Sequence, residues 1–185
     1  MELFDDDKVG ALHSGPRKRK FIPQTSGKSD DVATPDWLME YVMQEFPQVA
    51  SDPCPLEPEE DGLGCDWDAW SYVNPPFSEC QTWVEKAVME AKKGNYSVML
   101  IPATFNSCYW RETVLANASE IRILTCPIRF DNQKKQVVTQ MALVIFAAPT
   151  GNGGCLSISA IEPKGWSQHY YKRKRNMSRF CAGEN

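Results

Sequence analysis

Histidine is scarce in this sequence, with two histidines among 185 residues. His13 and His169 both fall near the ends of the chain, in regions that we expect to lie outside the folded body. Their positions argue against chemistry that needs a histidine base, such as hydrolysis by a serine and histidine pair. The seven cysteines are odd in number, scattered and without a CxxC pair, so we expect reduced thiols in an intracellular protein and no zinc site.

Long apolar runs are also missing. No stretch reaches the roughly 18 consecutive apolar residues of a membrane-spanning helix, so no membrane partner is expected. The first four residues are followed by three aspartates, which is not the pattern of a signal peptide. The chain has 185 residues, of which 42% are hydrophobic. This length and composition are enough for it to bury a core of its own. We expect one folded domain at 31–163, between tails at 1–30 and 164–185.

The net charge of −4 conceals an uneven distribution. Residues 31–163 hold 8 lysines and arginines against 18 aspartates and glutamates, whereas residues 164–185 hold 6 basic residues and 1 acidic residue. Basic clusters lie at 17–20 and 172–175. They are interpreted either as phosphate contacts or as a nuclear-import signal or solubilising tails. The candidate nucleic-acid contacts are Lys134, Lys135, Lys172, Arg173, Lys174 and Arg175.

Apolar periodicity and turn residues predict a mixture of helices and strands. Helices are expected at 34–46, 78–93 and 106–118, and strands at 48–51, 70–73, 96–101, 120–125, 137–147 and 155–161. Thr34 is expected to cap the first helix, with Pro35 at its first position, and Gly94 to end the second. A polar turn at 131–135 predicts that the strand at 137–147 is antiparallel to its predecessor. The pattern favours an α/β fold with a mostly parallel sheet and an antiparallel strand in its C-terminal part.

One stretch is chemically unusual, because Asn74, Pro75, Pro76 and Phe77 follow directly on the strand at 70–73. Two prolines impose an extended, rigid turn, and ligands bind at the carboxyl ends of strands in open α/β sheets. The Asn74 side-chain oxygen and the Pro75 carbonyl can accept the two hydrogens of an exocyclic amine, while Phe77 offers a face for stacking. We therefore expect a cradle for a planar group that carries an amine. The plainer interpretation is a proline-rich turn that ends a strand.

This tetrapeptide resembles the catalytic motif of the amino-group DNA methyltransferases, in which Asp, Asn or Ser precedes two prolines and an aromatic residue. Further motifs, similar in order and spacing to the small phage- and virus-type DNA N6-adenine methyltransferases, cover about residues 33–148. These motifs are Thr34-Pro35, Asp52-Pro53-Cys54-Pro55, Glu60-Asp61-Gly62-Leu63, Asp66-Trp67, Asn74-Pro75-Pro76-Phe77, Trp83-Val84-Glu85-Lys86-Ala87, Leu100-Ile101-Pro102-Ala103 and Ile128-Arg129-Phe130.

The resemblance implies a Rossmann-like methyltransferase fold that binds S-adenosylmethionine and methylates the N6 amine of adenine in DNA. It assigns catalysis to the tetrapeptide at 74–77. It places Thr34 at the carboxylate end of the cofactor and Asp66 near the cofactor's adenine. Asp52, with Pro53 and Cys54 after it, is placed beside the cofactor's methionine part. The glycine-rich loop that larger methyltransferases carry after the first strand is absent, and 53–55 stands in its place.

The chemistry expected at such a cradle needs neither a strong base nor a metal. The adenine amine is a poor nucleophile because its lone pair is delocalised into the ring. Acceptors at Asn74 and Pro75 would localise that lone pair, so positioning would supply most of the catalysis. The target base would have to be flipped out of a duplex or be single-stranded. An RNA adenine methyltransferase, and a cofactor- or DNA-binding module without catalysis, stay open as alternatives.

Several other residues are given plainer roles. Trp67, Trp70, Trp83 and Trp110 are expected in the core rather than as platforms for bases. Lys86 and Arg129 are expected at the surface or on phosphates. The oligomeric state and the recognition sequence do not follow from these patterns.

Overall fold

The computed structural model of the protein describes residues 32–58, 60–128, 130, 139–148 and 155–163. The helical elements are α1 (Asp36–Glu45), a 3-10 turn η1 (Phe77–Glu79), α2 (Cys80–Lys93), a π-helical turn η2 (Trp110–Val114) and α3 (Leu115–Asn117). The strands are β1 (Trp70–Val73), β2 (Tyr96–Pro102), β3 (Glu120–Leu124), β4 (Met141–Phe146) and β5 (Ser157–Ile161). None of the helices in these ranges is long and apolar enough to cross a membrane.

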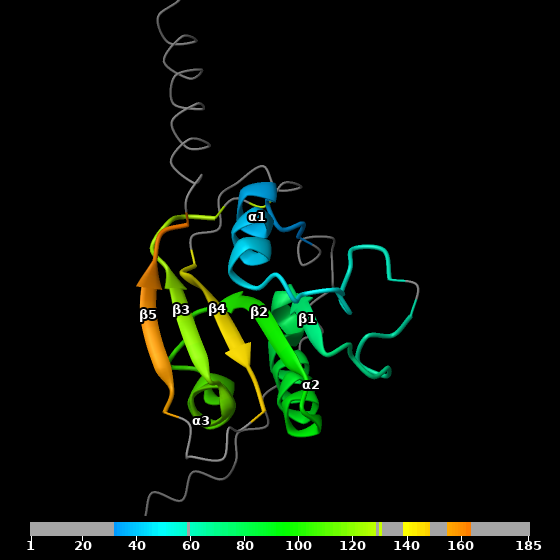
Figure 1. Ribbon diagram of the computed structural model, residues 1–185. Coiled ribbons are helices and arrows are strands. Elements are labelled where there is room, and N and C mark those ends of the chain that lie inside the picture. The colour runs from blue at the N-terminus through cyan, green and yellow to red at the C-terminus, as the bar shows by residue number, and fades with distance from the viewer. Residues whose placement is uncertain (1–31, 59, 129, 131–138, 149–154, 164–185) are drawn as a thin grey trace, which may run out of the picture.

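The five strands form one sheet in the order β1-β2-β4-β3-β5 (Figure 1). β1 pairs with β2, and β3 with β5, in parallel fashion, while β4 is antiparallel to both β2 and β3. Four strands therefore run in one direction and β4 in the other. The predicted α/β fold with a mostly parallel sheet is confirmed, and so is the antiparallel pairing of the strand in 137–147 with its predecessor.

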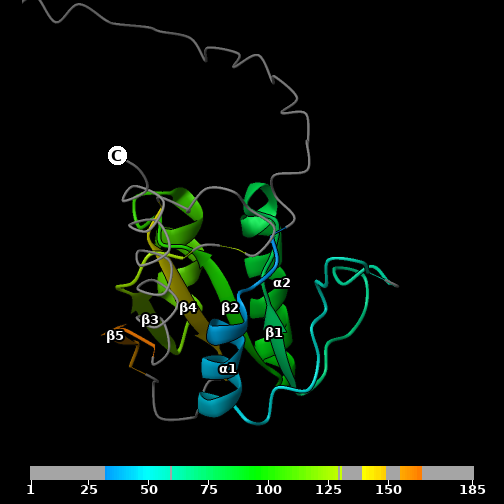
Figure 2. The ribbon, with the colours of Figure 1, turned by 90° about the horizontal axis from the view of Figure 1, so that it is seen from above.

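Helices cover both faces of the sheet, so that the molecule has three layers (Figure 2). Alternate residues of each central strand enter different cores. In β2, Val98 and Leu100 join the core under α1, whereas Met99 and Ile101 join the core under α2 and η2. All six residues of β4 are buried. This double burial explains why these strands are nearly continuous apolar runs in the sequence.

The end of α2 agrees with the sequence prediction, whereas the start of α1, the helix at 106–118 and the strand at 48–51 differ from it. α2 ends at Gly94, whose φ of 102° is the left-handed conformation that glycine adopts without strain. The prediction that Thr34 caps α1 was wrong, because Pro35 occupies the capping position and no side chain caps this helix. The helix expected at 106–118 is shorter and contains the π turn of η2. The strand expected at 48–51 is reduced to a single bridge between Ser51 and Ser71.

Several sequence predictions lie outside the described residues. They are the tails at 1–30 and 164–185, Arg129, and the candidate nucleic-acid contacts Lys134, Lys135, Lys172, Arg173, Lys174 and Arg175. Their roles stay predictions. The tryptophan predictions can be judged, because Trp67, Trp83 and Trp110 are buried and Trp70 is half-buried and stacked on Tyr96.

Candidate active site

A cavity of about 330 Å³ lies at the carboxyl end of β1, where the chain turns into Asn74. The segment that precedes Asp52 runs beside β1, because Tyr72 N–H donates to the Ser51 carbonyl at 2.9 Å. Asp52 and Asn74 therefore emerge at the same edge of the sheet, where ligands of open α/β sheets bind. The cavity is lined by Val32, Ala33, Thr34, Met39, Asp52, Cys54, Pro55, Leu56, Tyr72, Asn74 and Pro76.

The amide of Asn74 is held by its nitrogen. Asn74 Nδ2 donates to the Val32 carbonyl at 2.6 Å and to Thr34 Oγ1 at 3.2 Å. Asn74 Oδ1 is buried and has no hydrogen-bond partner among the described residues. A buried acceptor without a donor costs about 1–3 kcal/mol. The arrangement thus keeps a strong acceptor available at the cavity at some cost in stability.

Thr34 and Tyr72 complete this polar corner. Thr34 Oγ1 lies 2.8 Å from the Tyr72 hydroxyl, and either oxygen can be the donor. Tyr72 is 2% exposed. Burial, and to a lesser extent the nearby Asp52 carboxylate, raise the pKa of Tyr72 well above its usual range, although the hydrogen bond with Thr34 opposes this. The phenol therefore keeps its proton, and the corner is uncharged.

Among the described residues that line the cavity, Asp52 is the charged one. Its Oδ1 accepts a hydrogen bond from Cys54 N–H at 2.8 Å, which fixes the carboxylate as in many Asx turns. Surrounding protein raises the pKa of Asp52 by desolvation, and the hydrogen bond from Cys54 opposes that rise. Asp52 is exposed to solvent in the described structure, and its carboxyl group at the cavity is suited to a cationic ligand group.

The chain between Asp52 and β1 is packed closely onto α2. Gly62 fits against the Pro53 carbonyl so tightly that a Cβ there would lie 1.8 Å from the carbonyl oxygen. Trp67 Nε1 donates to the Gly62 carbonyl at 2.7 Å. Pro53 itself does not line the cavity. Its neighbours Asp52 and Cys54 line the cavity, and the contact between Pro53 and Gly62 holds this short segment in place.

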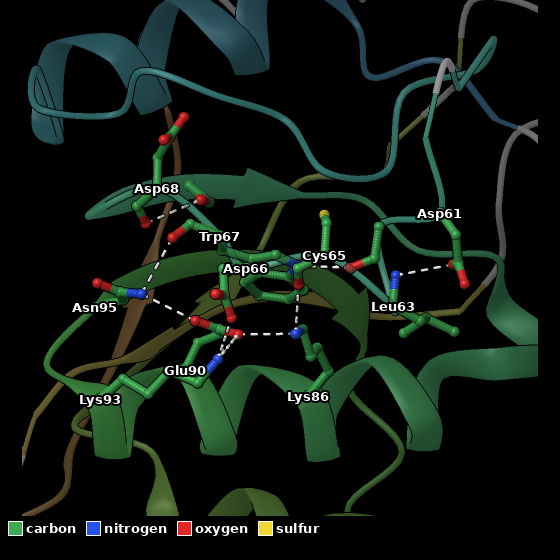
Figure 3. A network of polar contacts seen from close by, with 12 residues as sticks. Asp61, Leu63, Cys65, Asp66, Trp67, Asp68, Lys86, Glu90, Lys93 and Asn95 are labelled. Atoms are coloured by element: carbon green, nitrogen blue, oxygen red, sulfur yellow. Dashed lines mark hydrogen bonds and ion pairs between the residues drawn. The ribbon is translucent and has the colours of Figure 1, made fainter.

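A buried ion pair anchors the same segment from below (Figure 3). Lys86 is 7% exposed, pairs with Glu90 at 2.8 Å and donates to the Cys65 carbonyl at 2.6 Å. Burial alone would raise the pKa of Glu90, but hydrogen bonds from Lys86, Lys93 and Asn95 lower it to about 2. The expectation that Lys86 lies at the surface or on a phosphate was wrong, because its ammonium group is committed inside the protein.

Asp66, like Pro53, does not line the cavity, whereas the predicted cofactor residues Thr34, Asp52 and Cys54 do. Its side chain is 88% exposed and pairs with Lys93 at 2.6 Å (Figure 3). Its neighbour Trp67 is buried, and the Trp67 carbonyl accepts a hydrogen bond from Asn95 at 3.1 Å. Asp66 therefore lies at the surface next to the buried Trp67. Its contact with the cofactor's adenine stays a prediction.

The aromatic residue of the tetrapeptide is half-buried and contacts both cores of the protein. The ring of Phe77 meets the ring of Phe130 edge to face, with centroids 5.7 Å apart. Phe130 is fully buried. Pro75 is buried as well, and in the described part of the chain no backbone N–H is bonded to its carbonyl. Pro75 thus offers a second acceptor next to Asn74.

Sequence reasoning missed two residues of this site. Val32 contributes a backbone carbonyl, which any residue can supply, so no side-chain signal could have revealed it. Tyr72 lies two positions before Asn74 in a strand for which only Trp70 was given a role, in the core. An aromatic hydroxyl in a buried strand needs a partner, and this requirement is the one signal that pointed beyond packing.

Comparisons with known proteins point to one family. The model of the DNA N-6-adenine-methyltransferase (Dam) family matches residues 24–146. The DNA N-6-adenine-methyltransferase of Haemophilus phage HP1 is 29% identical over 105 residues, which make up 50% of this chain and 61% of that relative. The chain thus spans about three fifths of the relative's length.

Among solved structures, a Listeria monocytogenes protein assigned to the class I S-adenosylmethionine-dependent methyltransferases aligns with a TM-score of 0.48 and 14% identity. The alignment covers 80% of this chain and 72% of that one. The family match includes Thr34, Asp52 and the tetrapeptide at 74–77, and it covers about two thirds of the chain. The protein belongs to the DNA N-6-adenine-methyltransferase (Dam) family.

Proposed function

We propose that the protein transfers a methyl group from S-adenosylmethionine to the N6 amine of adenine in DNA. The observation that carries this proposal is the buried Asn74 Oδ1, which has no hydrogen-bond donor among the described residues. An exocyclic amine of a base would satisfy it and so remove the cost of leaving it unpaired. The Dam family and the phage relative's name identify adenine as that base.

The cavity fits the proposed cofactor in size and charge. Its volume of about 330 Å³ lies in the range of about 300–1,000 Å³ typical of small-molecule sites. The charged residue in the described part of its lining is Asp52, which suits the positively charged methionine part of S-adenosylmethionine. We propose that Asp52 and Cys54 hold that part, and that Pro53 keeps them in place. The cofactor, when bound, supplies an electrophilic methyl group on a sulfonium.

The residues of the tetrapeptide would then act on the adenine amine. Asn74 Oδ1 and the Pro75 carbonyl each accept one of its hydrogens, which draws the nitrogen toward tetrahedral geometry and localises its lone pair. Phe77 stacks against the base, and Phe130 supports Phe77 by its edge contact. No strong base is needed, because the amine loses its proton only after positive charge has developed. Catalysis then rests on positioning and on hydrogen bonds prepared in advance.

The substrate is proposed to be DNA rather than RNA on the strength of the family match alone, and RNA remains the second candidate. A base in a duplex must be flipped out before it can reach Asn74. We also propose that the basic clusters at 17–20 and 172–175 hold phosphates, since the region 31–163 is acidic. Such a reaction would take place inside a cell, in keeping with the odd number and scattered positions of the seven cysteines in the sequence.

The test is transfer of labelled methyl from S-adenosylmethionine to DNA and to RNA, followed by mass spectrometry of the nucleosides. We expect N6-methyladenine in DNA, and none with Asn74→Ala, which removes the acceptor Oδ1 together with the two hydrogen bonds that Nδ2 donates to Val32 and Thr34. Cofactor binding by Asn74→Ala, measured by calorimetry, should remain close to that of the wild type. Product in RNA alone would favour the second candidate. Near-normal turnover of Asn74→Ala would refute the proposed role of Asn74.

A further inference from the structure

We propose that Thr34 and Tyr72 are positioning residues that orient the amide of Asn74, so that their hydroxyls act on methyl transfer and not on cofactor affinity. The inference rests on the proposed function, because it concerns how Asn74 presents its oxygen to the adenine amine. It differs from the role that the family resemblance implies for Thr34, which is a contact with the carboxylate end of the cofactor.

The orientation of the amide follows from its partners. The Val32 carbonyl lies 2.6 Å from Asn74 Nδ2 and can only accept a hydrogen bond. Rotating the amide by half a turn would bring Oδ1 against that carbonyl, which is repulsive. The second hydrogen of Nδ2 is directed to Thr34 Oγ1 at 3.2 Å. Both donors of Asn74 are thus used on one side, and Oδ1 is left for the substrate.

The Thr34 hydroxyl is itself held by Tyr72. Their oxygens are 2.8 Å apart, and a hydroxyl oxygen has one hydrogen and two lone pairs. Whichever of the two donates, Thr34 keeps a lone pair for Asn74 Nδ2. Tyr72 cannot drift, because it is buried and its backbone is paired with Val98 of β2 and Ser51. The relay therefore runs from the rigid sheet, through two hydroxyls, to the amide.

The packing of α1 supplies the other side of this corner. Thr34 lies two residues before α1, whose Trp37 and Leu38 are buried against the sheet. Val32 is 5% exposed and belongs to the same core. The segment 32–34 thus enters the active site with its position set by the docked helix. This explains why Thr34 is not a helix cap: its hydroxyl is committed to Tyr72 and Asn74.

The test compares full-length variants that lose one hydroxyl but keep nearly the same shape. Thr34→Val and Tyr72→Phe should each lower kcat by about 5- to 30-fold, as expected for the loss of about 1–2 kcal/mol of orientation. The cofactor Kd, measured by calorimetry, should change by less than about twofold. Thr34→Ser, which restores the hydroxyl, should recover most of the lost kcat.

A matched control is Ser71→Ala, which removes a buried hydroxyl beside Tyr72 that hydrogen-bonds to the Ser51 hydroxyl and the Asp68 carbonyl rather than to Asn74. Its kcat should equal that of the wild type. A weaker cofactor Kd with unchanged kcat in Thr34→Val would overturn the inference and assign Thr34 to the cofactor. Unchanged kcat in both Thr34→Val and Tyr72→Phe would overturn it as well. A wild-type protein without transfer activity would instead refute the proposed function.

Discussion

Gly62 offers the sharpest test of how the cofactor pocket is built. A Cβ at this buried position would lie 1.8 Å from the Pro53 carbonyl oxygen and 2.9 Å from Cη2 of Trp83. A comfortable carbon–oxygen contact is about 3.3 Å, so Gly62→Ala must push the two segments apart by about 1.5 Å. The segment that moves carries Asp52 and Cys54, which flank Pro53 and line the cavity.

We expect Gly62→Ala to lower the free energy of unfolding by about 1–3 kcal/mol, the usual cost of forcing a group into a packed interior. Cofactor affinity should fall by at least about tenfold, because displacements near 1 Å at a site have effects of this order or larger. Urea denaturation measures the first quantity, and calorimetry with S-adenosylmethionine or its demethylated product measures the second.

Gly64→Ala is the matched control. A Cβ at Gly64 would lie 3.0 Å from Oδ2 of the exposed Asp61 side chain and 3.6 Å from the Asp61 carbonyl oxygen, so a shift of a few tenths of an ångström accommodates it. Its stability should therefore stay within about 0.5 kcal/mol of the wild type, as for most surface changes, and its cofactor affinity should be unchanged. If Gly62→Ala behaves like Gly64→Ala in both measurements, the contact between Gly62 and Pro53 does not position the pocket wall.

Three further predictions follow from features described above. Because the folded pKa of Glu90 is lowered from 4.5 to about 2, its contribution to stability is present above pH 4.5 and is lost as the pH falls toward 2. Glu90→Gln should flatten the pH dependence of the unfolding free energy in that window, and an unchanged slope would contradict the assignment. Asn74→Asp should lower kcat by at least about tenfold, because a carboxylate oxygen would face the Val32 carbonyl; wild-type turnover would show that the amide nitrogen is dispensable. Removing residues 170–185 should weaken DNA binding and reduce its salt dependence, and an equal salt slope would mark these residues as a tail without phosphate contacts.

The sequence was most informative where local patterns determine structure. The apolar run of β2, the apolar face of α2 and the glycine that ends it were all predictable, because each follows from residues within one or two turns of itself. The turn at 74–77 was equally accessible, since proline restricts the backbone whatever surrounds it.

Errors arose where a residue has a distant partner. Thr34 carries the local signature of a helix cap, yet its hydroxyl bonds to Tyr72, 38 positions away in the sequence. Lys86 has the pattern of an exposed lysine, yet it meets a carbonyl 21 positions earlier and a buried glutamate. The Lys86–Glu90 pair has helical spacing, but its burial does not follow from that spacing. The bonds of Thr34 to Tyr72 and of Lys86 to the Cys65 carbonyl depend on how distant segments pack against each other.

The place of β4 in the sheet has a consequence for how the molecule assembles. In the described sheet, β2 and β3 are not paired with each other. They are joined through β4, which follows both of them in the sequence. Without residues 141–146, one edge of β2 would be unpaired, because β1 and β4 are its two neighbours in the sheet. Ala103, the residue after β2, also donates a hydrogen bond from its N–H to the Gln140 carbonyl. We therefore expect that the segments around the cavity do not fold independently of β4. Pairing between strands that are distant in the sequence also makes folding slow.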